Sequence, residues 1–204
     1  MLALGTAACG STTPASQPAP LQSRPLASLA GQHAVLLPTH YLRPDSIGWA
    51  VRVTRPREML VALDSAIERN LKARGFALGW AFPAALARSA KRNAGYVADP
   101  YTLAGEKLRP LARMTDNTVH EPLATQIRNI IAMNDARYAV FPVEMRFVPG
   151  DSGSARPVLR VALIDGRTST VVWSGDVYGA AGTQPDAAML DGLASAFADL
   201  VGAP

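Results

Sequence analysis

Three strand-like runs follow one another in the last third of the chain, and they constrain its fold more than any other feature. They cover residues 137–148, 157–165 and 170–179, and they are rich in Val, Ile, Leu and aromatic residues. Short turn segments separate them, with Pro-Gly-Asp-Ser-Gly at 149–153 and Asp-Gly-Arg at 165–167. Because such short connections join neighbouring antiparallel strands, the sequence predicts an antiparallel three-stranded meander.

The side-chain pattern of these runs predicts two unlike sheet faces. In the first run every second residue from Ala139 to Phe147 is apolar, whereas Glu144 and Arg146 belong to the alternate set. In the second run Arg160 is out of phase with its apolar neighbours. Since alternate residues of a strand point to opposite faces, we expect one apolar face covered by helices and a second face that is partly polar.

Four segments have the pattern of helices that cover such a sheet. They are 56–75, 83–93, 121–134 and 183–202. The first is the clearest, because Pro56 suits a first turn, Gly75 suits a helix end and the apolar residues between them recur at helical spacing. In the last segment Thr183 and Asp186 have the spacing of a capping box, which places Thr183 at the helix start.

Two more strands are predicted at 33–38 and 76–82, and residues 95–120 read as a long irregular connection with a helical turn near 108–114. A chain of 204 residues suits one domain with a tail. The resulting order, β-α-β-α-(α)-β-β-β-α, predicts a single α/β domain with a mixed sheet.

The start of the chain carries the only cysteine, Cys9, behind small residues and ahead of a Pro-, Ser- and Thr-rich run. The segment Thr-Ala-Ala-Cys at 6–9 resembles the lipobox of bacterial lipoproteins, although leucine is usual where Thr6 stands. The resemblance implies that residues 1–8 are part of a signal peptide and that Cys9 is acylated and becomes the first mature residue. The alternative is an incidental cysteine in a discarded leader.

We therefore expect three parts: a partial signal peptide at 1–8, a lipidated cysteine with a flexible tether at 9–31, and the α/β domain at 32–204. The composition of 10–28 supports the tether, because four prolines among Ser, Thr, Ala and Gln cannot build a core. Gly10 after the cysteine, in place of the aspartate that retains enteric lipoproteins in the inner membrane, favours the outer membrane by resemblance.

The sequence contains no established catalytic or cofactor motif, so it predicts no catalytic residue, metal site or cofactor. Phosphate-binding glycine signatures, a nucleophile elbow and a paired-histidine zinc motif are all missing. His33, His40 and His120 are far apart in the sequence, and Glu121 beside His120 suits a helix start better than general-base chemistry. The net charge of +4 comes from scattered basic residues without interleaved aromatics, which does not favour nucleic-acid binding.

Three residues are candidates for partner contact. Trp49 follows the first strand, and a loop tryptophan of this kind is expected to be an exposed contact residue. Trp173 is expected to pack on its strand, as tryptophan commonly does in sheets. Arg160 is expected to pair with Asp176 across the meander.

The combination resembles a group of bacterial envelope lipoproteins with a fold like the amino-terminal domain of TolB, including the curli-secretion lipoproteins and LpoB-type activators of penicillin-binding proteins. The residues that carry the resemblance are HAVLLPT at 33–39, ALDSAIERNLKARGF at 62–76, ARYAVFPVEMRF at 136–147 and LRVALIDGRTSTVVWSGDVYG at 159–179. The resemblance implies docking to other envelope proteins, or assembly with further copies, and no turnover. The long hairpin insertions of the pore-forming members are not evident.

These observations give three hypotheses. The first is a membrane-anchored, non-enzymatic lipoprotein that faces the periplasm and binds another envelope protein. The second is an exported hydrolase with a site near His120 and Glu121. The third is a domain that binds a small ligand on the open sheet face or at the 95–120 loop, recognisable by a pocket with a few inward polar groups.

Overall fold

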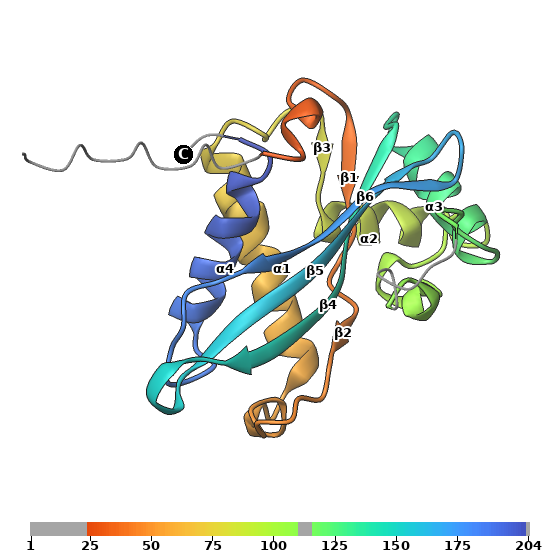
Figure 1. Cartoon of the computed structure of the whole chain (residues 1–204). Coiled ribbons are helices and arrows are strands. Elements are labelled where there is room, and N and C mark those ends of the chain that lie inside the picture. Colours follow the sequence, from red (N-terminus) through yellow and green to blue (C-terminus); the bar gives the residue numbers. More distant parts are fainter. Residues whose placement is uncertain (1–23, 110–115, 203–204) are drawn as a thin grey trace, which may run out of the picture.

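A mixed sheet of six strands forms the middle of the computed structural model, which describes residues 24–109 and 116–202 (Figure 1). The strands are β1 (Ala34–Leu36), β2 (Tyr41–Leu42), β3 (Trp80–Ala81), β4 (Tyr138–Pro149), β5 (Ala155–Asp165) and β6 (Thr170–Tyr178). Their order is β3, β1, β4, β5, β6, and β2 also pairs with β4. Pairs that involve β1 or β2 are parallel, whereas β4, β5 and β6 form the predicted antiparallel meander. The predicted α/β class with a mixed sheet is confirmed.

Both sides of the sheet carry helices (Figure 1). The helices are α1 (Pro56–Ala73), α2 (Pro83–Arg92), α3 (Leu123–Met133) and α4 (Ala187–Asp199). The first and last, α1 and α4, lie side by side against one face, and α2 and α3 cover part of the other. Proline stands at the first turn of α1 and α2, where its missing N–H leaves no bond unmade.

The predicted cap of the last helix is wrong by three residues. Asp186, and not Thr183, is the residue that begins α4, because its carboxylate accepts a hydrogen bond of 2.9 Å from the Met189 N–H. Aspartate at the cap satisfies a backbone donor that the helix cannot, and its charge also suits the positive end of the helix dipole. Both roles need the side chain before the first turn and not inside it.

The strand β4 does not keep one apolar face along its whole length, as the alternation predicted. A register shift between Pro142 and Glu144 inserts one extra residue opposite β5. Ala139 and Phe141 therefore pack against α2 and α3, while Phe147 packs on the side of α1 and α4. Such a bulge reverses the alternation beyond it, and proline without an N–H is common at this position.

The break between β1 and β2 lies beside this bulge. Leu36 pairs with Val140, Leu37 still donates its N–H to the Val140 carbonyl, and the next parallel pair is Tyr41 with Glu144, so the stretch 38–40 leaves the regular ladder. Pro38 in that stretch has no N–H to donate, which suits a break in the strand. The two irregularities together divide the sheet into two halves with different side-chain phase.

Two hydrophobic clusters result, one on each side of the sheet. The larger joins α1, α4 and the sheet and includes Leu63, Ile67 and Phe197. It also includes Leu26 and Leu29, so residues of the expected tether 9–31 pack into the domain core. The smaller cluster lies under α2, α3 and the 97–108 segment. The predicted turn near 108–114 lies largely outside the described residues, and its described neighbour is a 3-10 helix at Gly105–Leu108.

Truncation of the larger core should lower stability strongly. Phe197 of α4 is fully buried between α1 and the sheet. For Phe197→Ala we expect the free energy of unfolding to fall by about 3–5 kcal/mol, because a buried ring is lost and a cavity remains. Urea denaturation of the wild type and the variant measures this difference in the free energy of unfolding. Leu78→Ala is the control: this side chain is 89% exposed, and its removal should change stability by less than about 0.5 kcal/mol.

Candidate functional site

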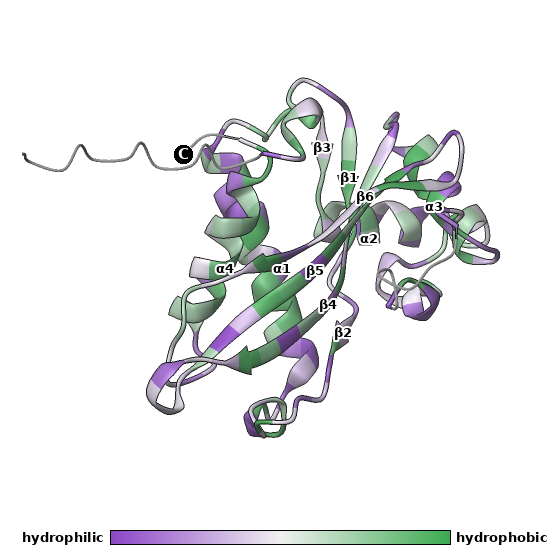
Figure 2. Ribbon diagram, in the orientation of Figure 1, coloured by the Kyte–Doolittle hydropathy of each residue, from purple (hydrophilic) through white to green (hydrophobic). Residues whose placement is uncertain are grey.

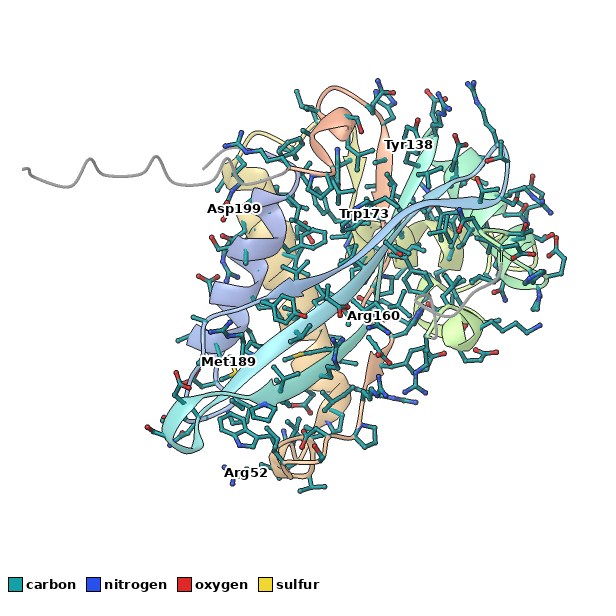
Figure 3. All side chains as sticks on the ribbon, in the orientation of Figure 1. Arg52, Tyr138, Arg160, Trp173, Met189 and Asp199 are labelled. Atoms are coloured by element: carbon teal, nitrogen blue, oxygen red, sulfur yellow. The ribbon has the colours of Figure 1, made fainter. Side chains whose placement is uncertain are left out.

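Four arginines and two carboxylates gather on the half of the sheet that α2 and α3 leave uncovered. We call them the arginine cluster: Arg43, Arg109, Arg146, Arg160, Glu144 and Asp176. Figure 2 shows the hydrophobic colour of β5 interrupted by a hydrophilic stretch partway along the strand, and Figure 3 shows Arg160 on the side of the sheet towards β2. The expected polar part of the second face is thus present, but it occupies only one half.

Glu144 is the centre of the cluster. It is 1% exposed, and its two oxygens accept hydrogen bonds from Arg43 at 3.3 Å and from Arg109 at 3.1 Å. Arg160 lies 3.8 Å from the same carboxylate. A buried carboxylate is costly unless it is paired and hydrogen-bonded, and these partners fulfil that condition.

Asp176 on β6 binds the other two guanidinium groups. Arg146 approaches it at 2.6 Å, and Arg160 makes two hydrogen bonds of 3.0 and 3.2 Å, so the predicted pairing of Arg160 with Asp176 is confirmed. Burial alone raises the pKa of Asp176, but the hydrogen bonds and charges of Arg146 and Arg160 hold it below the usual value. Asp176 is therefore ionised throughout the neutral range.

The cluster carries an excess of positive charge. Four guanidinium groups face two carboxylates, which leaves two positive charges. Arg43 and Arg109 are roughly half exposed, so their outer N–H groups face solvent. Guanidinium groups in this state bind carboxylates or phosphates in a fork geometry, and they supply no nucleophile or proton acceptor.

A cavity of about 560 Å³ lies beside the break between β1 and β2. Thr39, His40, Tyr41, Leu60 of α1, and Asp99 and Tyr101 of the connecting segment form most of its wall. Asp64 lies behind Thr39, one turn along α1 from Leu60. Ligands of open α/β sheets commonly bind at the carboxyl ends of strands, and this cavity follows the carboxyl end of β1.

Asp64 replaces the sheet partner that Thr39 loses at the break. Its Oδ1 accepts the Thr39 N–H at 2.9 Å and the Thr39 hydroxyl at 2.7 Å, and the side chain is 3% exposed. Burial raises the pKa of Asp64 to about 7, against the opposing effect of these two hydrogen bonds. Its Oδ2 is buried without a hydrogen-bond partner in the described part of the chain.

His40 is held in the neutral form in the same wall. Its Nε2 lies 2.8 Å from the Pro100 carbonyl, its ring packs edge-on against Phe141, and burial lowers its pKa to about 4. It makes no hydrogen bond with Thr39 or Asp64, so the three residues do not form the nucleophile, base and orienting chain that acyl transfer needs.

Trp49 is not the exposed contact residue that its loop position predicted. It is 2% exposed, and its ring lies 5.6 Å from that of Phe147 in the larger core, with Arg52 over its other side. The expectation of exposure is wrong because the loop folds back over the end of β4 beyond the bulge. Asp45 fixes this fold by accepting the backbone N–H groups of Ile47 and Trp49.

Trp173 packs against the larger core from β6, as expected of a strand tryptophan. Its ring lies over Gly175, where an added Cβ would come within 2.5 Å of the indole. Cys9 lies outside the described residues, so its acylation remains a prediction. The structure therefore places Arg160 in the arginine cluster and puts Trp49 and Trp173 in or beside the core.

The structure does not bring the histidines together. His33 contacts the Asp135 carbonyl, His40 lines the cavity, and His120 lies 3.7 Å from Asp116 on an exposed surface. Glu121 accepts two hydrogen bonds from Thr125 and one from Arg128, and these lower its pKa. Glu121 therefore stabilises the start of α3, which is the simpler interpretation that its position suggested.

Within 24–109 and 116–202, no group of three or more His, Cys, Asp or Glu residues is placed to bind a metal ion. Asp64, Glu144 and Arg109 were not predicted as site residues. Asp64 does not belong to the apolar pattern of the 56–75 segment, and Arg109 lies in the poorly patterned 95–120 connection. The only signal that the sequence offered for Glu144 was its departure from the apolar pattern of its strand.

Among solved structures, the chain is similar to LpoB from two organisms and to PelC. The C-terminal domain of LpoB from Salmonella enterica is 15% identical, with a TM-score of 0.42, and the match covers 76% of this chain and 93% of that chain. A PelC dodecamer from Paraburkholderia phytofirmans is 15% identical, with a TM-score of 0.37 and coverage of 91% and 94%.

LpoB of Escherichia coli also matches, with 15% identity, a TM-score of 0.40 and coverage of 88% and 85%. The LpoB-type resemblance seen in the sequence thus recurs in the structural comparison. No protein-family model and no curated protein matches the sequence.

Removal of the central charge should destabilise the arginine cluster. For Glu144→Gln we expect the free energy of unfolding to fall by about 3 kcal/mol, because Arg43, Arg109 and Arg160 lose their shared buried counter-charge. Chemical denaturation at neutral pH measures the change.

The matched control is Glu68→Gln, which breaks an exposed pair with Lys72 on α1 and should cost about 0.5 kcal/mol or less. Equal effects of the two substitutions would show that Glu144 is not the centre of the cluster's stability.

Proposed function

We propose that this protein is a non-enzymatic envelope protein, held at the membrane by an acylated Cys9, and that its α/β domain binds an acidic surface of another envelope protein through the arginine cluster. The observation that carries the proposal is the excess of two positive charges on a partly exposed sheet face. Opposite charge on a partner accelerates association and fixes its orientation.

The surroundings of the cluster suit a protein partner. Tyr178 is the last paired residue of β6 and is about half exposed, and the ring of Tyr41 packs under Arg109. Tyrosine and arginine are the residues that contribute most at the centres of protein interfaces. Arg146 and Arg160 are already held by Asp176, so little side-chain freedom is lost when a partner binds.

Binding fits the chemistry of the described residues better than turnover does. The cluster contains only guanidinium groups and carboxylates that are already hydrogen-bonded to them. The residues named for a hydrolase, His120 and Glu121, face solvent and make structural contacts. We therefore favour the docking hypothesis over the exported enzyme.

The tether is the second part of the proposal. Its support is the sequence around Cys9, where small residues precede the cysteine and a Pro-rich run follows it. Among the described residues, no helix has both the length and the apolar character that a membrane span requires. A single acyl chain binds membranes only weakly, so a stable anchor requires the multiple chains of a lipoprotein cysteine.

Mass spectrometry of the protein purified from its own membranes tests the tether. We expect a diacylglyceryl adduct on a chain that begins at Cys9, and we expect Cys9→Ala to release the protein from the membrane fraction. An unmodified chain that still contains residues 1–8 would contradict the tether and leave the domain's own binding chemistry untouched.

Photo-crosslinking tests the docking surface. With a photo-reactive phenylalanine at position 178, we expect an adduct with one envelope protein whose yield falls with added salt, because the attraction is electrostatic. The double substitution Arg43→Gln and Arg109→Gln removes both excess charges, and it should weaken binding to the isolated partner by about tenfold or more.

The control is the double substitution Arg88→Gln and Arg92→Gln on α2, which changes the total charge equally at an exposed site away from the cluster. Equal losses in the two double variants would mean that only the overall charge matters. A yield that does not depend on salt would also contradict the proposed surface.

A further inference from the structure

The cavity beside the break between β1 and β2 has the properties of a ligand site that is separate from the arginine cluster. We propose that it binds a small primary amine, with the ammonium group between Thr39, His40 and Tyr101 and with Asp64 as the buried counter-charge. Its volume of about 560 Å³ is in the range of small-molecule pockets, and its wall combines apolar and polar groups.

The polar atoms of the inner wall are acceptors. Thr39 Oγ1 gives its proton to Asp64 Oδ1 at 2.7 Å, so the lone pairs of the hydroxyl remain free to accept. His40 Nε2 faces the Pro100 carbonyl at 2.8 Å and must carry the ring proton, which makes Nδ1 an acceptor. That Nδ1 atom is buried without a partner in the described part of the chain. A ligand for this wall has to bring donors.

Asp64 gives a second reason, independent of the acceptor atoms in the wall, to expect a positively charged ligand. It is 3% exposed, and its Oδ2 has no hydrogen-bond partner among the described residues. No basic side chain of the described residues forms an ion pair with it, in contrast to Glu144, which three arginines surround. A buried carboxylate with an open acceptor is stabilised most by a cation that reaches its surroundings.

The wider electrostatic field of the cavity points the same way. Burial, followed by the charges of Asp64, Asp99 and Glu68, raises the pKa of Tyr101. Burial, followed by the charge of Glu106, likewise raises the pKa of Tyr41. Arg57 is the one basic residue among those that line the cavity, and it is exposed at the rim.

A primary ammonium group fits these features. It has three donors and no acceptor, so it matches a wall of acceptors without leaving a donor unpaired. Tyr41 and Tyr101 also line the cavity, and aromatic rings attract cations over distances of up to about 6 Å. A neutral polyol of equal length lacks the charge that the buried Asp64 carboxylate favours.

The pH dependence of binding follows from Asp64, whose pKa burial raises to about 7. A bound cation favours the ionised carboxylate, so amine affinity should rise as the pH increases through about 7. The other groups that face the cavity do not reproduce this rise. His40, with its pKa near 4, is already neutral at pH 6, and burial raises the pKa of Tyr101, so Tyr101 ionises only at higher pH. Asp99 and Arg57 are the other charged residues that line the cavity.

Titration with 1,5-diaminopentane, followed by the amide signals in two-dimensional NMR, tests the proposal on the 204-residue chain carrying Cys9→Ala. We expect saturable shifts of residues 39–41 and 99–103, with about tenfold tighter binding at pH 8 than at pH 6. The matched neutral probe, 1,5-pentanediol, should cause no saturable shift. Equal responses to the two probes would overturn the proposal, as would shifts spread over the surface without saturation.

Two variants separate binding from folding. Asp64→Asn should lose about tenfold in amine affinity at pH 8 and should show no change between pH 6 and 8. If this variant fails to fold, Arg57→Gln decides: it removes an exposed rim charge, so the fold is kept, and it should tighten amine binding about threefold. An Arg57→Gln protein with unchanged or weaker affinity would contradict the acidic character of the site.

Because the amine site shares no test residue with the docking surface, the two proposals can fail independently. Loss of partner binding in the Arg43 and Arg109 double variant says nothing about Asp64, and loss of amine binding in Asp64→Asn says nothing about the arginine cluster.

Discussion

One irregularity in the sheet determines where both polar sites of this domain lie. The bulge in β4 between Pro142 and Glu144 adds a residue. On the side of β4 that faces β1 and β2, the break between these two strands lies at the same level. Beyond the bulge the alternation of β4 is reversed, so Glu144 moves to the side of the sheet where Phe141 lies before it. Between β1 and β2, Thr39 and His40 leave the ladder and line a cavity. Without this irregularity Glu144 would point into the apolar core beneath α1 and α4.

The two sites solve the cost of a buried carboxylate in opposite ways. Three guanidinium groups lie within ion-pair distance of the single Glu144 carboxylate, so the positive charge around it exceeds its own negative charge. Asp64 receives only the N–H and hydroxyl of Thr39, and burial therefore shifts its proton equilibrium towards neutral pH. A carboxylate that is overcompensated presents positive charge to an acidic partner, whereas one that is undercompensated favours an incoming cation. The same residue type thus gives surfaces of opposite preference within one domain.

Much of the fold could be predicted from the sequence, because the apolar residues recur at helical or strand spacing over segments long enough to identify each element. Apart from the short strand β2, which was expected to be loop, the order of elements follows from local pattern and turn chemistry. The helix from Pro56 and the pairing of Arg160 with Asp176 follow in the same way. The bulge could not be predicted, since one inserted residue leaves the composition of β4 unchanged. For that reason Met145 and Phe147 were assigned to the wrong face. Trp49 was misjudged for a related reason: its burial depends on Phe147, whose own position depends on the bulge.

Tyr41 separates the two sites, and this arrangement explains how opposite charges coexist so near to each other. Its hydroxyl donates to Glu106 at 3.2 Å on the acidic side, and its ring face lies 5.1 Å from the Arg109 guanidinium on the basic side. The polar tip and the π face of one aromatic ring thus satisfy one charged group each. Arg109 in turn binds Glu144 and does not reach across to neutralise Asp64. The arginines of the cluster are held by Glu144 and Asp176, and Arg57 stays exposed at the rim of the cavity, so Asp64 keeps its undercompensated charge.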